Sequence, residues 1–278
     1  MPDLTDPRIT RPGERSVSCQ VVSASAAIRK TPDPGSEIAT QALHGEVVDI
    51  FHREGAFGRA QCRRDRYVGW VEMEAIAIPA LPPTHKIGAL RTIAFTKPDV
   101  KSPVRMRLTL GALLTATGRR QGAWMEFDHA GWIHDSHIHL LDRFENDPVA
   151  IARRYLEAPY LWGGRESNGI DCSGLTQQAF EACGVLIPRD TDMQAAWAGD
   201  PVDPGALQRG DLVFWDGHVG IMASADTLLH ANAHHMMVAE EPLEAAAGRL
   251  APVAGPVTGA RRIDLGRARG SVEAWLKG

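Results

Sequence analysis

The feature that most constrains the fold of this chain is a weak internal repeat of about sixty residues in its first half. Each copy has a kinked proline element early, TPDP or FTKPD, and an aromatic strand late, YVGWV or AGWIH. Between these landmarks the segments are short and alternate in polarity, with turns at the spacing of small β-barrel strands. We therefore predict two small all-β domains, residues 16–79 and 84–142, joined by the proline-rich linker IPALPPTH.

The second half of the chain has a different pattern, in which helices precede strands. Residues 144–158, FENDPVAIARRYLEA, are predicted to form an amphipathic helix that opens a third domain, residues 144–265. One or two helices then precede GDLVFWDGHVGIMAS and TLLHANAHHMMVAEEPL, which have the composition of consecutive strands. Past residue 250 the chain is rich in Ala, Gly and Arg and supports no prediction.

Charge and composition exclude several classes of protein. The 278 residues carry a formal net charge of −4 with a pI near 6.3, which argues against nucleic acid as a partner. The polar start MPDLTDPRITRPGERSVSC lacks the apolar core of a secretory signal, and no apolar run reaches the length of a membrane span. The four cysteines form no C-x-x-C pair and would stay thiols in a reducing compartment. We expect a cytoplasmic protein without a membrane partner, and its oligomeric state stays open.

One cysteine stands at a position that favours chemistry. In YLWGGRESNGIDCSGLTQQAF, glycine-rich turns deliver Cys172 to the start of a segment with helical spacing. Asp171 or Ser173 would cap the first turn. A thiol there lies beside unpaired amide N–H groups and the positive end of the helix dipole, which we expect to lower its pKa. The alternative is a small, buried cysteine that only packs.

Two histidines are placed to assist such a thiol. His218 follows a turn and opens an apolar strand, and His230 ends the next apolar stretch, TLLH. Two antiparallel strands joined by the SADT turn would bring the two rings side by side. His230 would then hold Nδ1 of His218 and leave Nε2 of His218 to face the thiol of Cys172. The alternative for each histidine is a hydrogen-bonded residue of an edge strand.

A metal site competes with this interpretation. A cluster of ligands is conceivable here, formed by His218, His230, His234, His235 and Asp216. The H-E-x-x-H spacing of a helical zinc peptidase is missing from the sequence. A thiol at a helix start with two strand histidines fits a cysteine hydrolase better, so we predict no metal and no organic cofactor.

These residues carry a resemblance to a known family. APYLWGG, GIDCSGLTQQAF, IPRDTDMQA, LQRGDLVFW, GHVGI and LLHA resemble, in order, the successive motifs of the NlpC family of papain-like cell-wall peptidases. The repeat in the first half is similar to tandem bacterial SH3-like domains, in which a Gly-Trp-Val or Gly-Trp-Ile strand closes each barrel. The resemblance implies an α+β fold in which two small all-β SH3-like barrels precede a papain-like NlpC domain.

The resemblance also implies roles for individual residues. It implies a catalytic triad of Cys172, His218 and His230, with Tyr160 reaching the thiol and the oxyanion region. The remaining contacts that it implies are to the substrate or its pocket, and they come from Asp171, Ser173, Trp162 and Thr191. For Trp162 and Trp215, packing in the core is the alternative, and we favour it for Trp215.

The activity implied by the family is hydrolysis of the γ-D-glutamyl bond to a diamino acid in bacterial murein peptides. Meso-diaminopimelate and lysine both stay open as that diamino acid. Cytoplasmic family members with this order of domains trim free muropeptides whose L-Ala is unblocked, and a carboxylate and a tyrosine of the first barrel meet its ammonium. Glu46 and Tyr67 are our candidates here, with Glu72 as a rival. A solvated glutamate and a core tyrosine are the alternatives for these positions.

Three other functions stay open beside this one. A wall-anchored hydrolase would act on the intact wall, although the export signal that it needs was not found in the sequence. A wall-binding module with a dead peptidase domain would lack a member of the triad, and none is missing. An acyltransferase of the same fold would use the same cysteine and histidines.

Overall fold

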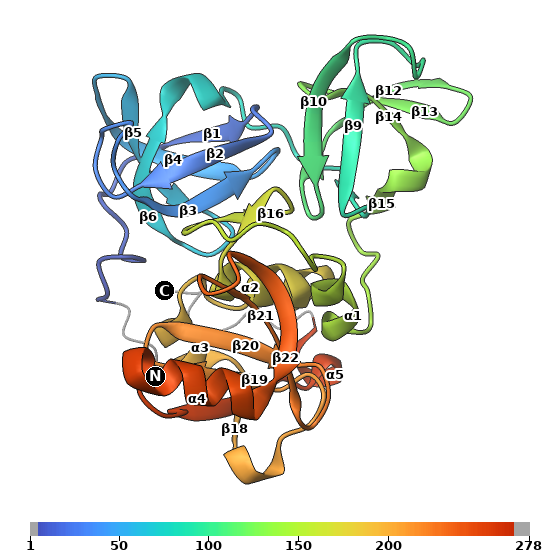
Figure 1. The fold of residues 1–278 in the computed structure, drawn as a ribbon. Coiled ribbons are helices and arrows are strands. Elements are labelled where there is room, and N and C mark those ends of the chain that lie inside the picture. The colour runs from blue at the N-terminus through green and yellow to red at the C-terminus, as the bar shows by residue number, and fades with distance from the viewer. Residues whose placement is uncertain (1–4, 270–278) are drawn as a thin grey trace. The chain divides into compact units, whose positions relative to one another are not determined.

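The computed structural model describes residues 5–269, and the chain separates into two compact units (Figure 1). One unit extends to Arg143 and the other begins at Phe144. The first consists of strands with two short 3-10 helices, and the second combines helices with a large sheet. This division agrees with the fold class predicted from the sequence.

The first part of the N-terminal unit is a seven-stranded sheet in the order β3-β2-β6-β5-β4-β1-β7. Alternate side chains of these strands point inward and form a buried apolar cluster that includes Val21, Ile28, Val48 and Val71. The strands and the short helix η1 have the following bounds: β1 Val17–Val21, β2 Ser25–Arg29, β3 Ile38–Leu43, β4 Val47–Glu54, β5 Phe57–Cys62, β6 Val68–Glu72, η1 Met73–Ala75 and β7 Ile76–Ala77.

The second part has a separate core and repeats the order of the first. A five-stranded sheet, β10-β9-β14-β13-β12, and a three-stranded sheet, β11-β8-β15, enclose Ile87, Leu114 and Phe127. In both parts a Gly-Trp strand, a 3-10 helix and a short strand follow one another at the end, as β6-η1-β7 and β14-η2-β15. The bounds are β8 His85–Ile87, β9 Arg91–Phe95, β10 Val104–Thr109, β11 Leu113–Leu114, β12 Ala116–Gln121, β13 Trp124–Phe127, β14 Gly131–His134, η2 Asp135–His137 and β15 Ile138–Leu140.

The two parts of this unit touch at a glycine. Leu113 donates its backbone N–H to the carbonyl of His44 at 2.8 Å. Gly45 has a φ of 79°, and a Cβ atom there would lie 2.2 Å from the carbonyl oxygen of Leu113. Only glycine meets both conditions, the left-handed backbone and the close approach. The boundaries at residues 79 and 84 stay predictions.

The C-terminal unit contains a six-stranded antiparallel sheet in the order β18-β23-β19-β20-β21-β22. Helix α2 packs on β20 and β21, and α4 lies over a buried cluster that includes Trp215 and Leu228 (Figure 1). The helices are α1 Pro148–Arg153, α2 Cys172–Ala182, α3 Thr191–Trp197, η3 Pro204–Ala206, α4 Leu243–Ala254 and α5 Leu265–Ala268. The strands are β16 Arg165–Glu166, β17 Gly169–Ile170, β18 Asp200–Val202, β19 Leu212–Trp215, β20 His218–Met222, β21 Thr227–Asn232, β22 Met237–Pro242 and β23 Gly259–Arg262.

The structure confirms the consecutive strands and corrects the first helix. The predicted strand stretches form β19 to β22, but the helix predicted over residues 144–158 is limited to α1, Pro148–Arg153. Asp147 caps α1 by accepting from the N–H groups of Val149 and Ala150, so the residues before it lie outside the helix. Glu157, with a φ of 66°, lies beyond its end. Within residues 5–269, no helix has the length and apolar character needed to cross a membrane.

Candidate active site

Cys172 is the first residue of helix α2, as the sequence predicts. Asp171 caps the helix, and its Oδ1 accepts the N–H of Gly174 at 2.7 Å. Gly174 is required here because a Cβ atom would lie 2.3 Å from the carbonyl oxygen of Gly164 in the preceding loop. The glycine-rich loop therefore packs directly on the first turn of α2, the turn that begins at Cys172.

A buried ion pair fixes this loop to the helix. Arg189 contacts Asp171 through two hydrogen bonds, of 2.7 and 3.0 Å, and both side chains are buried. Arg189 also donates to Ser173 Oγ at 2.8 Å and to the carbonyl of Gly164 at 3.3 Å. The second oxygen of Asp171 accepts the N–H of Gly163 at 2.8 Å. Arg189 was not among the predicted site residues, and the predicted substrate contacts of Asp171 and Ser173 stay predictions.

The sulfur of Cys172 lies between α3 and the start of β20. Its Sγ is 3.8 Å from Oγ1 of Thr191, the first residue of α3. The sulfur also accepts the backbone N–H of Val219, which lowers the thiol pKa, and Val219 directly follows His218. Burial and, after it, the carboxylate of Asp171 outweigh this contact and raise the pKa of Cys172 to about 11. The prediction of a lowered pKa is therefore wrong, because the cost of burying the thiolate exceeds the effect of the helix start.

His218 and His230 lie side by side on adjacent strands, with Nε2 of His218 2.7 Å from Nδ1 of His230. The residue opposite His230 on β20 is Gly220, where a Cβ atom would lie 2.6 Å from the Leu228 side chain and 3.2 Å from Cβ of His230. The predicted pairing had the nitrogens of His218 reversed. Nε2 of His218 is taken up by His230, and the sulfur of Cys172 is hydrogen-bonded to the backbone N–H of Val219, the residue after His218. Nδ1 is therefore the nitrogen left for the thiol.

A carboxylate that the sequence analysis missed completes this group. Oε1 of Glu241, on β22, is 2.7 Å from Nε2 of His230, and Oε2 accepts from Nη1 of Arg249 on α4 at 2.7 Å. Burial raises the pKa of Glu241, but the bonds from Arg249 and His230 outweigh it and lower that pKa to about 2. The position of Glu241 depends on the pairing of β21 with β22, which sets Leu228 opposite Glu241.

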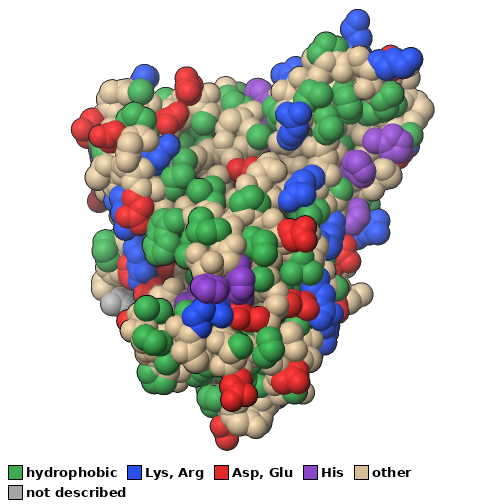
Figure 2. Space-filling model, viewed as in Figure 1, with side chains coloured by type: hydrophobic (Ala, Val, Ile, Leu, Met, Phe, Trp, Pro, Cys, Tyr) green, Lys and Arg blue, Asp and Glu red, His purple; other side chains and the backbone are tan. Residues whose placement is uncertain are grey.

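The structure groups the possible metal ligands differently from the sequence prediction. Among residues 5–269, the atoms of His230, His235 and Glu241 lie within 4.8 Å of one another. Histidine side chains are visible at the surface of this unit beside basic and acidic ones (Figure 2). Because Arg249 and His230 already occupy the carboxylate of Glu241, we assign these side chains to a hydrogen-bonded chain rather than to a metal centre.

Both central histidines are neutral at neutral pH. Burial, then the neighbouring His230, lowers the pKa of His218 to about 3, and burial lowers that of His230 to about 4, from a usual value of 6.5. Below pH 6.5 the unfolded chain therefore binds protons that the folded chain does not, so the free energy of unfolding must fall as the pH falls.

We predict that the stability of the protein drops between pH 7.5 and pH 5 by up to about 1.4 kcal/mol per pH unit for each of these two histidines. Urea denaturation at both pH values measures the drop. Replacing His218 and His230 together with glutamine should make it smaller, whereas His234→Gln, at an exposed position, should leave it unchanged. If the double variant lost as much stability as the wild type between pH 7.5 and pH 5, the loss could not be attributed to His218 and His230.

The aromatic candidates have different surroundings. Tyr160 is half-buried, and burial together with the nearby Cys172 raises its pKa, which agrees with a hydroxyl close to the thiol. Trp162 is 58% exposed, so core packing does not explain it. Trp215 is buried in the cluster under α4, as we favoured, and its ring centroid lies 5.8 Å from that of His218.

The candidates for the substrate amine belong to the N-terminal unit. Glu46 is buried, with an oxygen 3.6 Å from Nε of Arg64, so it is not a solvated strand glutamate. Tyr67 is also buried, and its backbone N–H donates to Asp65. The rival Glu72 is partly exposed and lies 3.9 Å from Arg29. Their roles toward a substrate stay predictions.

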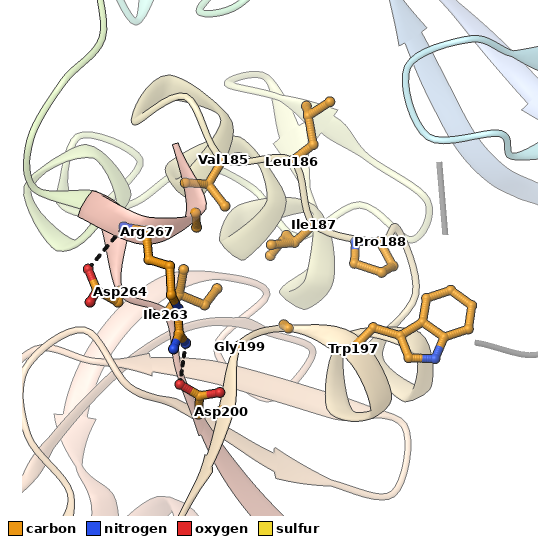
Figure 3. A pocket seen from close by; sticks show the side chains of 12 residues that line it. Val185, Leu186, Ile187, Pro188, Trp197, Gly199, Asp200, Ile263, Asp264 and Arg267 are labelled. Atoms are coloured by element: carbon orange, nitrogen blue, oxygen red, sulfur yellow. Dashed lines mark hydrogen bonds and ion pairs between the residues drawn. The ribbon is translucent and has the colours of Figure 1, made fainter. Parts of the chain in front are cut away.

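A separate pocket of about 300 Å³ lies between the loop before α3 and the segment around α5 (Figure 3). Its lining includes Ile187, Pro188, Trp197, Ile263 and Arg267, and Arg267 forms an ion pair with Asp200 there. None of the predicted site residues lines it. We assign it no part in the chemistry of Cys172.

Two parts of this chain match known domain families. Residues 157–247 match the NlpC/P60 family, and residues 28–76 match the bacterial dipeptidyl-peptidase Sh3 domain. The chain is 25% identical over 238 residues to Dipeptidyl-peptidase 6 of Lysinibacillus sphaericus, a match that covers 76% of this chain and 86% of that protein. It is 34% identical over 95 residues to the Gamma-D-glutamyl-L-lysine dipeptidyl-peptidase of Bacillus cereus, which is 34% of this chain but only 28% of that protein.

A solved structure shows the same fold over most of the chain. An NlpC/P60 family protein from Bacillus cereus superposes with a TM-score of 0.75 at 19% identity, covering 88% of this chain and 99% of the other. At this identity the likeness concerns the fold alone. The fold predicted from the motifs, with SH3-like domains before an NlpC domain, is confirmed.

Proposed function

Because this chain carries an NlpC/P60 domain behind a bacterial dipeptidyl-peptidase SH3 domain, we propose that it is a cysteine peptidase that cleaves the γ-D-glutamyl-diamino acid bond of murein peptides. The observation that carries the proposal is the position of the Cys172 thiol. It lies at the first turn of α2 and accepts a hydrogen bond from the backbone N–H of Val219, the residue after His218. The name of one relative, Gamma-D-glutamyl-L-lysine dipeptidyl-peptidase, supports the choice of bond, and that of another, Dipeptidyl-peptidase 6, supports peptidase activity.

The proposed reaction begins with a neutral thiol and a neutral imidazole. The S–H bond of Cys172 breaks as its proton joins Nδ1 of His218, and the sulfur electron pair forms a bond to the γ-carbonyl carbon. The N–H of Cys172, which as the first residue of α2 has no intrahelical acceptor, and the hydroxyl of Tyr160 are available to the oxyanion. His218 then gives the proton to the leaving amine, and water hydrolyses the acyl-enzyme and restores the thiol.

We further propose that the substrate is a free murein peptide with an unblocked L-Ala, and that the protein acts in the cytoplasm. An ammonium group needs a carboxylate partner when it is removed from water. Glu46 and Tyr67 are both buried, and both lie within residues 28–76, which match the bacterial dipeptidyl-peptidase Sh3 domain. This supports Glu46 over the more exposed Glu72 as the group that binds the substrate amine.

We predict that N-acetylation of L-Ala-γ-D-Glu-diaminopimelate lowers kcat/KM by about a hundred-fold or more. Acetylation removes the charge that Glu46 would pair with, and loss of one partner of a buried charge pair costs about 2–5 kcal/mol. The measurement compares kcat/KM on the free and the acetylated tripeptide. Intact wall sacculi, whose L-Ala is blocked, should be poor substrates for the same reason.

Two variants locate the determinant of this preference. Glu46→Gln should erase the preference for the free amine, and the matched variant Glu72→Gln should keep it. Equal kcat/KM values on both peptides in the wild type would contradict the proposal and favour a hydrolase of the intact wall.

A further inference from the structure

A chain of hydrogen bonds leads from the carboxylate of Glu241 to the base beside the thiol. Oε1 of Glu241 is 2.7 Å from Nε2 of His230, and Nδ1 of His230 is 2.7 Å from Nε2 of His218. At its other end the carboxylate of Glu241 accepts from both terminal nitrogens of Arg249. The links come from three adjacent strands, β20 to β22, and from α4.

The charge on Glu241 sets the direction of every bond in this chain. An ionised carboxylate only accepts hydrogen bonds, so Nε2 of His230 must carry a hydrogen and donate it. A neutral imidazole has one N–H, so Nδ1 of His230 then holds a lone pair and accepts from Nε2–H of His218. Nδ1 of His218 is left without a hydrogen, and it is the nitrogen that His230 does not take up.

We propose that Glu241, paired with Arg249, is a positioning residue that fixes the tautomers of both histidines and so makes Nδ1 of His218 the base for Cys172. The proposal rests on the proposed function, because it explains why Nδ1 of His218 carries no hydrogen and can act as the base in that reaction. With the opposite polarity, Nδ1–H of His230 would donate to His218, and Nδ1 of His218 would carry a hydrogen. That nitrogen could not accept the proton of the thiol.

The surroundings of His230 allow Glu241 to determine which of its ring nitrogens carries the hydrogen. His230 is completely buried, so water does not replace Glu241 as its partner. The charged and titratable groups that face it are Glu241 on β22, Arg249 on α4, His218 on β20 and His235, whose Nδ1 is bonded to Asn232. Arg249 keeps Glu241 ionised, and burial keeps both rings of the chain neutral.

The decisive variant is Glu241→Gln. Arg249 requires an acceptor, so the amide oxygen should face Arg249 and the NH₂ group should face Nε2 of His230, which reverses the chain. We expect kcat/KM to fall by about a hundred-fold or more, in line with amide replacement of a triad carboxylate, and to fall further than in Glu241→Ala. A role in packing alone predicts the opposite order, because glutamine has the shape of glutamate.

A matched control lies next to this residue on the same strand. Glu240 also pairs with an arginine, Arg153, on a more exposed side of β22. Glu240→Gln should therefore stay within about two-fold of the wild type, because single exposed ion pairs contribute little. Glu241→Gln activity equal to that of Glu240→Gln, or above that of Glu241→Ala, would overturn the proposal.

A measurement on the wild type needs no substrate and no variant of Glu241. Correlation of ring ¹⁵N with ring protons by NMR reports which nitrogen of each histidine carries a hydrogen, with His218→Gln and His230→Gln used to assign the signals. We expect Nε2–H on both rings, and Nδ1–H on His218 would overturn the proposal. Failure of the wild type to cleave murein peptides would instead contradict the proposed function. It would not change the tautomers of His218 and His230 that the NMR measurement reports.

Discussion

Replacement of Cys172 with serine or alanine is expected to abolish peptide hydrolysis, with a loss of at least about ten-thousand-fold in kcat. The proposed reaction forms a bond from this sulfur to the carbonyl carbon, and a serine hydroxyl beside a neutral imidazole is a far weaker nucleophile than a thiol. The fold should persist, because serine is close in size to cysteine and the hydroxyl of Thr191 and the N–H of Val219 are there to meet it. Hydrolysis assays and urea denaturation of each variant measure the two effects separately.

Cys183 provides the control for this prediction. It is a second, fully buried thiol at the end of the same helix, and burial raises its pKa to about 12. Cys183→Ala should keep a near-normal rate per folded molecule. Treatment with EDTA should leave the rate unchanged, since the proposed reaction needs no metal. Turnover by Cys172→Ser close to that of the wild type would refute the assignment of the nucleophile.

The fold could be predicted where the sequence carried repeated, local signals. The strands β19 to β22 follow from apolar runs bounded by turns, and the start of α2 follows from the glycine-rich loop and the cap at Asp171. The length of α1 was overestimated although Asp147-Pro148 carries a cap followed by a first-turn proline, and that signal could have placed the helix start. The helix α4 and the strand β23 were missed because their stabilising contacts come from distant residues, such as Trp215 and Val213.

The site was predictable only in its local part. Cys172, His218 and His230 stand in short motifs, so their approach could be expected from sequence. Glu241 has no motif of its own, and it reaches His230 only through the register of β21 with β22. The nitrogen of His218 that bonds to His230 depends on the direction in which the neighbouring strand approaches. No spacing along the chain encodes that direction.

The second large expected effect is a loss of stability when the buried ion pair between Asp171 and Arg189 is broken. Only 1% of the Arg189 side chain and 9% of the Asp171 side chain are exposed, and their atoms lie 2.7 Å apart. Arg189→Met would leave the carboxylate of Asp171 buried without its cation, which costs about 3–5 kcal/mol. That is a large part of the total stability of a domain, about 5–15 kcal/mol. We therefore expect a strongly lowered urea midpoint at neutral pH.

A double variant separates the charge from the shape of the side chains. Asp171→Asn combined with Arg189→Met removes both charges, so its loss of stability should be smaller than the sum of the two single losses. Arg267→Met, which breaks the exposed pair with Asp200, should change stability little. Additive and small losses at Asp171 and Arg189 would mean that the cap at Gly174 alone holds the start of α2. A large coupling would mean that the thiol of Cys172 keeps its place beside Val219 because a buried arginine ties the glycine-rich loop to the helix.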